Sequence, residues 1–207
     1  WNTKADMDTY YARFCKHFMK IDSPEFVKAL VKLGEIAHVD VRGYYMSILT
    51  HLLFFCGSSE DHGYLSPEDT VYTATDRPIG FYEDGKFVDK NTHLTSKDAT
   101  KWIKDLAKVR ATFVKSQKVK GSDPEGVLDY WLWAVDAMTL ASGKLQAFGV
   151  GGKLTADRKR AMLAEYKRLR KRFETLWMRC NRRSEIKLTL SYFDTEIKRL
   201  AAQPVNG

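Results

Sequence analysis

Apolar residues recur at steps of three and four along most of this chain, and this spacing constrains its fold more than any other feature. Residues at such steps lie on one face of an α-helix, whereas a strand needs a step of two. Two consecutive segments near the end follow the spacing of helices that meet along a seam, so we expect the chain to end in an antiparallel helix pair. Their stripes are Met162, Tyr166, Leu169, Phe173, Leu176 and Cys180, and then Ile186, Leu190, Phe193, Ile197 and Leu200.

The same period predicts further helices, and capping residues mark where several begin. Ser23, Thr95, Asp123 and Thr155 each carry a side-chain oxygen that can accept hydrogen bonds from the free amides of a helix start, and prolines follow two of them. The other stripes span residues 7–21, 26–37, 41–56, 102–113 and 128–138. We therefore predict an all-α fold, a bundle of about six or seven helices. At 207 residues it fits a single helical domain over residues 1–207.

Residues 57–95 interrupt the helical pattern with glycines, prolines and polar clusters. Two short runs of β-prone residues flank Asp84-Gly85 within this segment, and Asp-Gly tolerates the positive φ angles of a tight turn. We expect a loop and one small β-hairpin, inserted into the helical body as an excursion.

Positive charge is concentrated near the end of the chain. Residues 155–200 contain 14 lysines and arginines against 6 aspartates and glutamates, a surplus of eight that equals the net charge of the whole chain, +8. Cationic side chains displace counterions from phosphate, so such a helix pair could bind an anionic polymer or partner. The aromatic residues lie in the seam and not between the charges, which favours a solvated or partner-docked face over nucleic-acid binding. The residues of this face are Arg158, Lys159, Arg160, Lys167, Arg168, Arg170, Lys171 and Arg172.

No constellation in the sequence indicates catalysis, a cofactor or a metal. Residues 149–155, GVGGKLT, resemble a phosphate-binding loop only loosely, because Leu154 separates the lysine from the threonine and a helix precedes them. Neither CxxC nor HExxH occurs, so no zinc site is predicted. Acid pairs at 60–61, 68–69 and 83–84 are neighbours in sequence and do not converge by themselves. We expect no catalytic residue, no cofactor and no metal ligand in this chain.

The remaining composition predicts buried thiols and no membrane span. Cys15, Cys56 and Cys180 each fall in an apolar helical stripe, so we expect three free, buried cysteines. No window approaches the roughly 18 uninterrupted apolar residues that a transmembrane helix needs.

Residues 176–184, LWMRCNRRS, join the two C-terminal helices. Trp177 is large enough to anchor the seam, while Asn181 and Arg182 can hydrogen-bond the carbonyls exposed where the first helix ends. Arginine is favoured at that end because it is the negative pole of the helix. We expect Trp177, Asn181 and Arg182 to form a structural corner, with guanidinium groups that pair with carboxylates across the turn.

Residues 165–193 carry the pattern EYKxLxxxFExLWxxxNRxSxIxxxLxxF. This pattern resembles the C-terminal helical segment that follows the catalytic barrel in many bacterial glycoside hydrolase family 20 enzymes, the β-N-acetylhexosaminidases and their relatives. Trp1-Asn2 is similar to the pair at which the last barrel strand of that family ends. The matching positions in the C-terminal segment are Tyr166, Leu169, Leu176, Trp177, Asn181, Arg182 and Ser184.

The resemblance implies a non-catalytic C-terminal domain, cut from a longer bacterial chain, that buttresses the barrel or mediates association. Its partner would be the upstream barrel of the same polypeptide, which carries the family's catalytic Asp-Glu pair and acts on N-acetylhexosamine glycans. Trp1 is then the candidate for substrate contact, because a tryptophan near the end of the barrel commonly walls the sugar pocket. The resemblance also implies a periplasmic or secreted protein.

Two alternatives stay open at this point. The chain could be a free-standing helical module whose basic face, residues 155–183, grips an anionic polymer or partner. It could also bind a glycan through aromatic side chains of the excursion, if these lie on the surface. Those aromatic residues are Tyr64, Tyr72, Phe81 and Tyr82.

Overall fold

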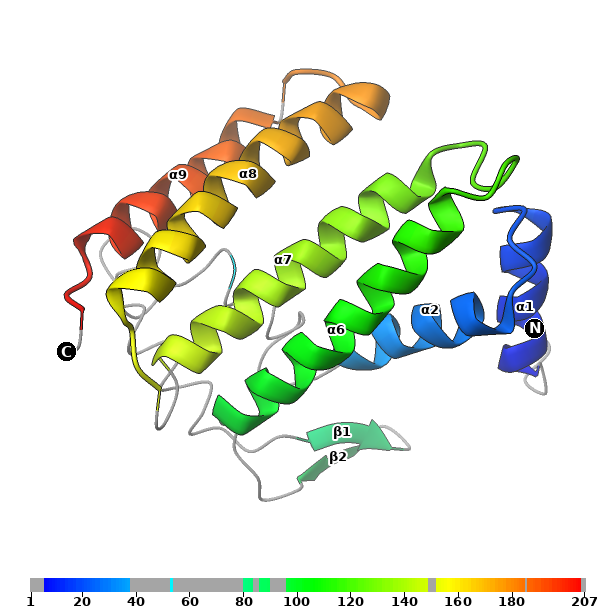
Figure 1. Ribbon diagram of the computed structural model, residues 1–207, viewed down its shortest axis with the longest axis horizontal. Helices are drawn as coiled ribbons and strands as arrows, with labels where there is room; N and C mark the ends of the chain where they lie inside the picture. Colours follow the sequence, from blue (N-terminus) through cyan, green and yellow to red (C-terminus); the bar gives the residue numbers. More distant parts are fainter. Residues whose placement is uncertain are drawn as a thin grey trace.

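A computed structural model describes residues 6–37, 53, 80–83, 86–89, 96–148, 152–184 and 186–205, the strands by their backbone alone. These residues form α1 (Met7–His17), α2 (Pro24–Ala37), β1 (Gly80–Glu83), β2 (Lys86–Asp89), α6 (Ser96–Gln117), α7 (Val127–Phe148), α8 (Ala156–Cys180) and α9 (Ile186–Ala202). Figure 1 shows α6 and α7 side by side, the α8–α9 pair next to α7, and α1 at the opposite end of the molecule from α9. The predicted all-α helical bundle is confirmed.

An aromatic cluster joins α2, α6 and α7. Phe26 of α2 and Phe113 of α6 are fully buried, and their ring centroids lie 5.1 Å apart. Trp131 of α7 completes the cluster, with its ring centroid 6.2 Å from that of Phe26. Aromatic pairs at these separations add attraction to the free energy gained by removing their large apolar surfaces from water. The predicted stripes of these three helices therefore meet in one core.

The C-terminal helices form the predicted antiparallel pair, and their contacts run in opposite directions along the two helices. Lys159, near the start of α8, donates a hydrogen bond to the carbonyl of Gln203, just beyond α9. Arg170, near the middle of α8, binds Asp194 near the middle of α9. Their seam is the predicted one over most of its length, with buried Met162, Tyr166, Leu169 and Leu176 on α8 and Ile186, Leu190, Phe193 and Leu200 on α9.

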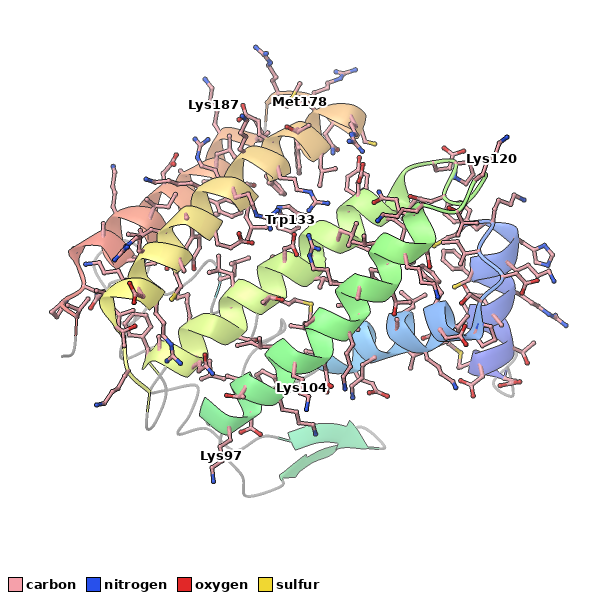
Figure 2. The ribbon with its side chains drawn as sticks, in the orientation of Figure 1. Lys97, Lys104, Lys120, Trp133, Met178 and Lys187 are labelled. Atoms are coloured by element: carbon pink, nitrogen blue, oxygen red, sulfur yellow. The ribbon has the colours of Figure 1, made fainter. Side chains whose placement is uncertain are left out.

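Trp133 connects the two helix pairs. In Figure 2 it projects from α7 toward α8, and its indole Nε1–H donates to the carbonyl of Leu169 at 3.0 Å. Its ring centroid lies 5.3 Å from that of Phe173 and 6.4 Å from that of Phe193. One side chain of α7 thus contacts both C-terminal helices.

The predicted hairpin is confirmed. β1 and β2 pair antiparallel, with Glu83 opposite Lys86 and Phe81 opposite Val88. Two residues separate the strands, the spacing of a tight hairpin. These two, Asp84-Gly85, lie outside the described residues.

The first helix departs from its prediction in length and in the face it buries. It ends at His17, before the predicted end at Ile21, and Lys20 adopts a left-handed conformation with φ 57°. Met7 and Phe18 belong to the predicted stripe but are 50% and 48% exposed. The turn after the helix brings Ile21 into the core, where its amide donates to the carbonyl of Cys15 at 3.0 Å. A tertiary contact therefore overrides the helical period at this end.

The start of α7 also differs from the prediction. Asp123 has φ 48°, so the chain turns there and the helix begins at Val127 instead of at the proline. An aspartate tolerates this conformation better than most residues. Its carboxylate still caps the helix, since it accepts from the amides of Val127 at 2.8 Å and Leu128 at 2.9 Å. Ser23 and Thr155 cap α2 and α8 through bonds of 3.2 and 3.3 Å, as predicted.

Several predictions fall outside the described residues. Thr95 is one of them, and of the helix predicted over 41–56 only Leu53 is described; it is buried, and its carbonyl accepts from the Tyr166 hydroxyl at 3.2 Å. Within the described ranges, no helix combines the length and the hydropathy that crossing a bilayer would need.

Candidate functional site

Helix α7 carries two of the three charged residues that are buried in the described part of the chain, and the third, Glu196, lies on α9. Asp136 and Lys144 are the only charged residues in its sequence between 131 and 148, and both are buried. A buried charge is costly unless it is paired and hydrogen-bonded. The partners of these two residues therefore define the candidate site.

Three arginines from two helices surround Asp136. Arg110 of α6 places Nε 2.7 Å from Oδ1, and two arginines of α8 reach Oδ2: Arg168 at 2.7 Å and Arg172 at 3.1 Å. The two residues on α8 are four apart, so they lie on one face of the helix. Arg168 also binds Glu165, and the hydrogen bonds to Glu165 and Asp136 raise the pKa of its guanidinium. One carboxylate thus ties α6, α7 and α8 together.

A second buried network joins α7 to α9. Lys144 Nζ lies 2.7 Å from Glu196 Oε2, and each side chain is only 3% exposed. Arg199 binds the other carboxylate oxygen, with Nη1 2.9 Å from Oε1. The ring of Tyr166 lies below the ammonium group, 5.8 Å from Nζ to the ring centroid. Because both oxygens of Glu196 are bound, this carboxylate is held by two cations from two helices.

These networks satisfy the polar atoms that they bury. Within the described ranges, every buried side-chain nitrogen or oxygen has a hydrogen-bond partner. The two networks therefore hold the helices that they join in a fixed arrangement.

The basic face of α8 is less solvated than predicted. Arg170 binds Asp194 through two hydrogen bonds of 2.7 and 3.0 Å, a bidentate geometry. Arg158 donates to the carbonyl of Lys153 at 3.1 Å and to that of Gln146 at 3.5 Å. Together with the two arginines bound to Asp136, these residues bind groups of the protein while their side chains stay partly exposed.

The predicted corner exists, but its bonds run through the backbone. Trp177 Nε1–H donates to the carbonyl of Arg182 at 2.9 Å, and its half-buried ring packs on Phe173 with centroids 5.7 Å apart. Asn181 caps α8 with its own amide, which donates to the carbonyl of Trp177 at 2.9 Å. The side chains of Asn181 and Arg182 are exposed and make no hydrogen bond or ion pair within the described part of the chain. The expectation that they cap the helix is therefore wrong for the side chains.

Among the arginines of the corner segment, Arg179 is the one that forms an ion pair with a described carboxylate. Its Nη1 lies 2.6 Å from Asp129 Oδ2 on α7, and this bond lowers the pKa of Asp129. Next to it, the Tyr130 hydroxyl lies 3.2 Å from Cys180 Sγ, and this hydrogen bond raises the pKa of Tyr130. Cys180 is exposed, so the prediction of a buried thiol is wrong there. Cys15 is buried as predicted.

Other predicted site residues have no described side chain. Trp1, Cys56, Tyr64 and Tyr72 lie outside the described residues, and Phe81 and Tyr82 are described as backbone of β1. The sequence analysis missed the buried charges of α7. A signal for them was present, because two charges interrupt an otherwise uncharged stretch of 18 residues.

Neither the search for metal-binding groups nor comparison with known proteins assigns a function to these residues. Among the residues whose placement is described, no group of three His, Cys, Asp or Glu side chains could hold a metal ion. Comparison with protein-family models, curated proteins and solved structures finds no match.

Proposed function

We propose that this chain is a non-catalytic helical domain that supports the catalytic barrel of a glycoside hydrolase family 20-like enzyme. The observation that carries the proposal is that the buried carboxylates are bound by cations of the chain itself. Both oxygens of Asp136 are bound by arginines of α6 and α8, and the oxygens of Glu196 are bound by Lys144 of α7 and by Arg199 of its own helix. Carboxylates whose two oxygens are both bound inside the protein hold helices in place, which suits a supporting domain.

The positions that resemble that family have structural surroundings, which also supports the proposal. Tyr166, Leu169 and Leu176 lie in the buried seam between α8 and α9. Trp177 closes the corner that reverses the chain. Matching residues that hold a helix pair together suit a supporting domain. The chemistry on N-acetylhexosamine glycans would then belong to the barrel.

Two measurements test the supporting role. We expect the purified chain to unfold cooperatively and to release no chromophore from an aryl N-acetylglucosaminide. We also expect the reading frame upstream of the Trp1 codon to encode a barrel with an Asp-Glu pair. Turnover that a point substitution in this chain abolishes, or an upstream frame without a barrel, would overturn the proposal.

A basic module that binds an anionic polymer is the second candidate, because part of the positive surplus stays on the surface. Lys167 and Lys171, one turn apart on α8, are exposed and form no ion pair within the described ranges. Lys187 projects away from the body of the protein in Figure 2. This candidate predicts salt-dependent retention on heparin that the pair Lys167→Glu and Lys171→Glu abolishes. Elution that is indifferent to salt excludes it.

A further inference from the structure

A groove of about 690 Å³ lies between α6, α7 and α8, beside the Asp136 network. Its volume falls within the range of about 300–1,000 Å³ that is typical of small-molecule sites. One part of its wall is apolar and the other is charged. The apolar part comprises Ile103, Ala107, Leu140, Gly143, Ala161 and Met162, and the charged part Arg110, Asp136, Glu165 and Arg168.

The charged part of the groove has hydrogen-bond donors that the protein does not use. Arg110 binds Asp136 through Nε, and within the described residues its two terminal nitrogens have no partner. Its side chain is 47% exposed, and Arg168, on the other side of Asp136, is 43% exposed. A guanidinium presents its donors in a fork that matches a carboxylate. Arg110 can therefore meet an anion through both terminal nitrogens, and Arg168 through Nη1, because its Nε and Nη2 bind Glu165 and Asp136.

The ion-paired cluster at the groove also lacks one negative charge. Three arginines, at 110, 168 and 172, share two carboxylates, those of Asp136 and Glu165. A single negative charge at this end of the groove would bring the cluster to neutrality. A ligand with one carboxylate supplies it.

The floor of the groove is kept open at Gly143. This glycine lies inside α7, where alanine would favour the helix more. Among the described residues, a Cβ added to Gly143 would meet no atom within 4 Å, so no contact between them requires the glycine. The open space belongs to the groove, next to the apolar wall formed by Leu140 and Met162.

We propose that this groove binds a small amphipathic monocarboxylate, whose acid group meets Arg110 and Arg168 and whose apolar body lies against Leu140, Gly143 and Met162. Apolar walls with a few placed polar groups are the usual composition of such a site. The site goes beyond the supporting role proposed above and does not depend on it, since a scaffold with or without a barrel can carry it.

The test is an NMR titration of the chain with octanoate, which follows the Gly143 amide and the arginine Nε signals. We expect saturable shifts with octanoate and at least about tenfold weaker binding of 1-octanol, which lacks the charge. Arg110→Met should weaken octanoate binding by about tenfold or more, because it removes a charge-assisted hydrogen bond. Gly143→Met should abolish binding, since its side chain occupies the groove.

Arg160→Met is the matched control, because Arg160 is an exposed arginine of α8 that binds Asp157 and does not line the groove. We expect it to bind octanoate like the wild type. If Arg110→Met lowers stability, Gly143→Met tests the site by a different route, since an added Cβ at Gly143 meets none of the described atoms within 4 Å. Absence of a saturable shift, equal affinity for 1-octanol, or octanoate binding that survives either groove substitution would overturn the proposal.

Discussion

The two ends of this molecule are held by different forces. Where α7, α8 and α9 meet, buried ion pairs and a tryptophan hydrogen bond join the helices. At the other end, Cys15 is the only residue within α1 that is buried, and the helix exposes apolar side chains such as Met7 and Tyr10. An apolar contact tolerates small shifts of one helix along another, whereas an ion pair requires particular atoms at particular places. We therefore infer that the α7–α9 end has one fixed register and that α1 is the more weakly held element.

Removal of the buried carboxylate at the α7–α9 end should have the largest effect. Glu196→Ala removes the carboxylate that binds both Lys144 and Arg199, so we expect the free energy of unfolding to fall by about 3–5 kcal/mol in urea denaturation. Glu174→Ala is the matched control, because Glu174 is 52% exposed and lies 4.0 Å from Arg170. It should cost less than about 0.5 kcal/mol. Equal losses of unfolding free energy in the two variants would mean that the buried ion pair stabilises the protein no more than the surface pair does.

Asp136→Asn should cost less than loss of Glu196, about 2 kcal/mol, because the arginines around Asp136 are partly exposed and can turn to water. Its control is Asp194→Asn. Asp194 has a bidentate arginine partner but is 47% exposed, so its loss should cost about 0.5–1 kcal/mol. Denaturant unfolding gives the free energy of unfolding of both variants. An Asp136→Asn protein as stable as the wild type would contradict the structural role of this network.

Hydrogen exchange compares the two ends without a substitution. We expect amides of α1 to be protected at least about tenfold less than those of α7, because α1 has little buried surface and opens without breaking a buried ion pair. Native-state exchange followed by NMR measures both in one sample. Equal protection in the two helices would mean that α1 unfolds with the rest of the bundle.

Substitutions in the corner should lower stability least. They should also show whether the corner is held by hydrogen bonds to the backbone or by side-chain bonds. Trp177→Phe removes the donor to the Arg182 carbonyl but keeps a ring against Phe173, so we expect a loss of about 1 kcal/mol. Arg182→Ala keeps that carbonyl, so its melting temperature should stay within error of the wild type. If Arg182→Ala lowered stability more than Trp177→Phe does, the corner would depend on side-chain bonds, as the sequence predicted.

Local patterns in the sequence predicted the helices, the hairpin and the C-terminal pair, because each depends on residues close together in the chain. The stripes of α6 and α8 and the caps at Ser23 and Thr155 are of this kind. The buried networks are not, since Arg110 lies 26 residues from Asp136 and Lys144 lies 52 from Glu196.

Tertiary contacts also explain the predictions that were wrong. Arg168 and Arg170 of α8 stay 43% and 31% exposed, as a solvated face would, but they also bind Asp136 of α7 and Asp194 of α9, which the helical period does not predict. The apolar stripe of α1 is only partly buried because the fold gives it few partners. The groove beside Asp136 could not be predicted, because its walls come from three helices.

A double-mutant cycle between Lys144 and Glu196 tests most directly the claim that buried charges lock α7 to α9. We predict that Lys144→Met and Glu196→Leu each destabilise the protein strongly. Together they should recover most of the loss, because both buried charges are removed and Arg199, which also binds Glu196, is 19% exposed and can reach water. The expected coupling energy is about 2–3 kcal/mol. Losses that simply add, with a coupling energy near zero, would contradict the account.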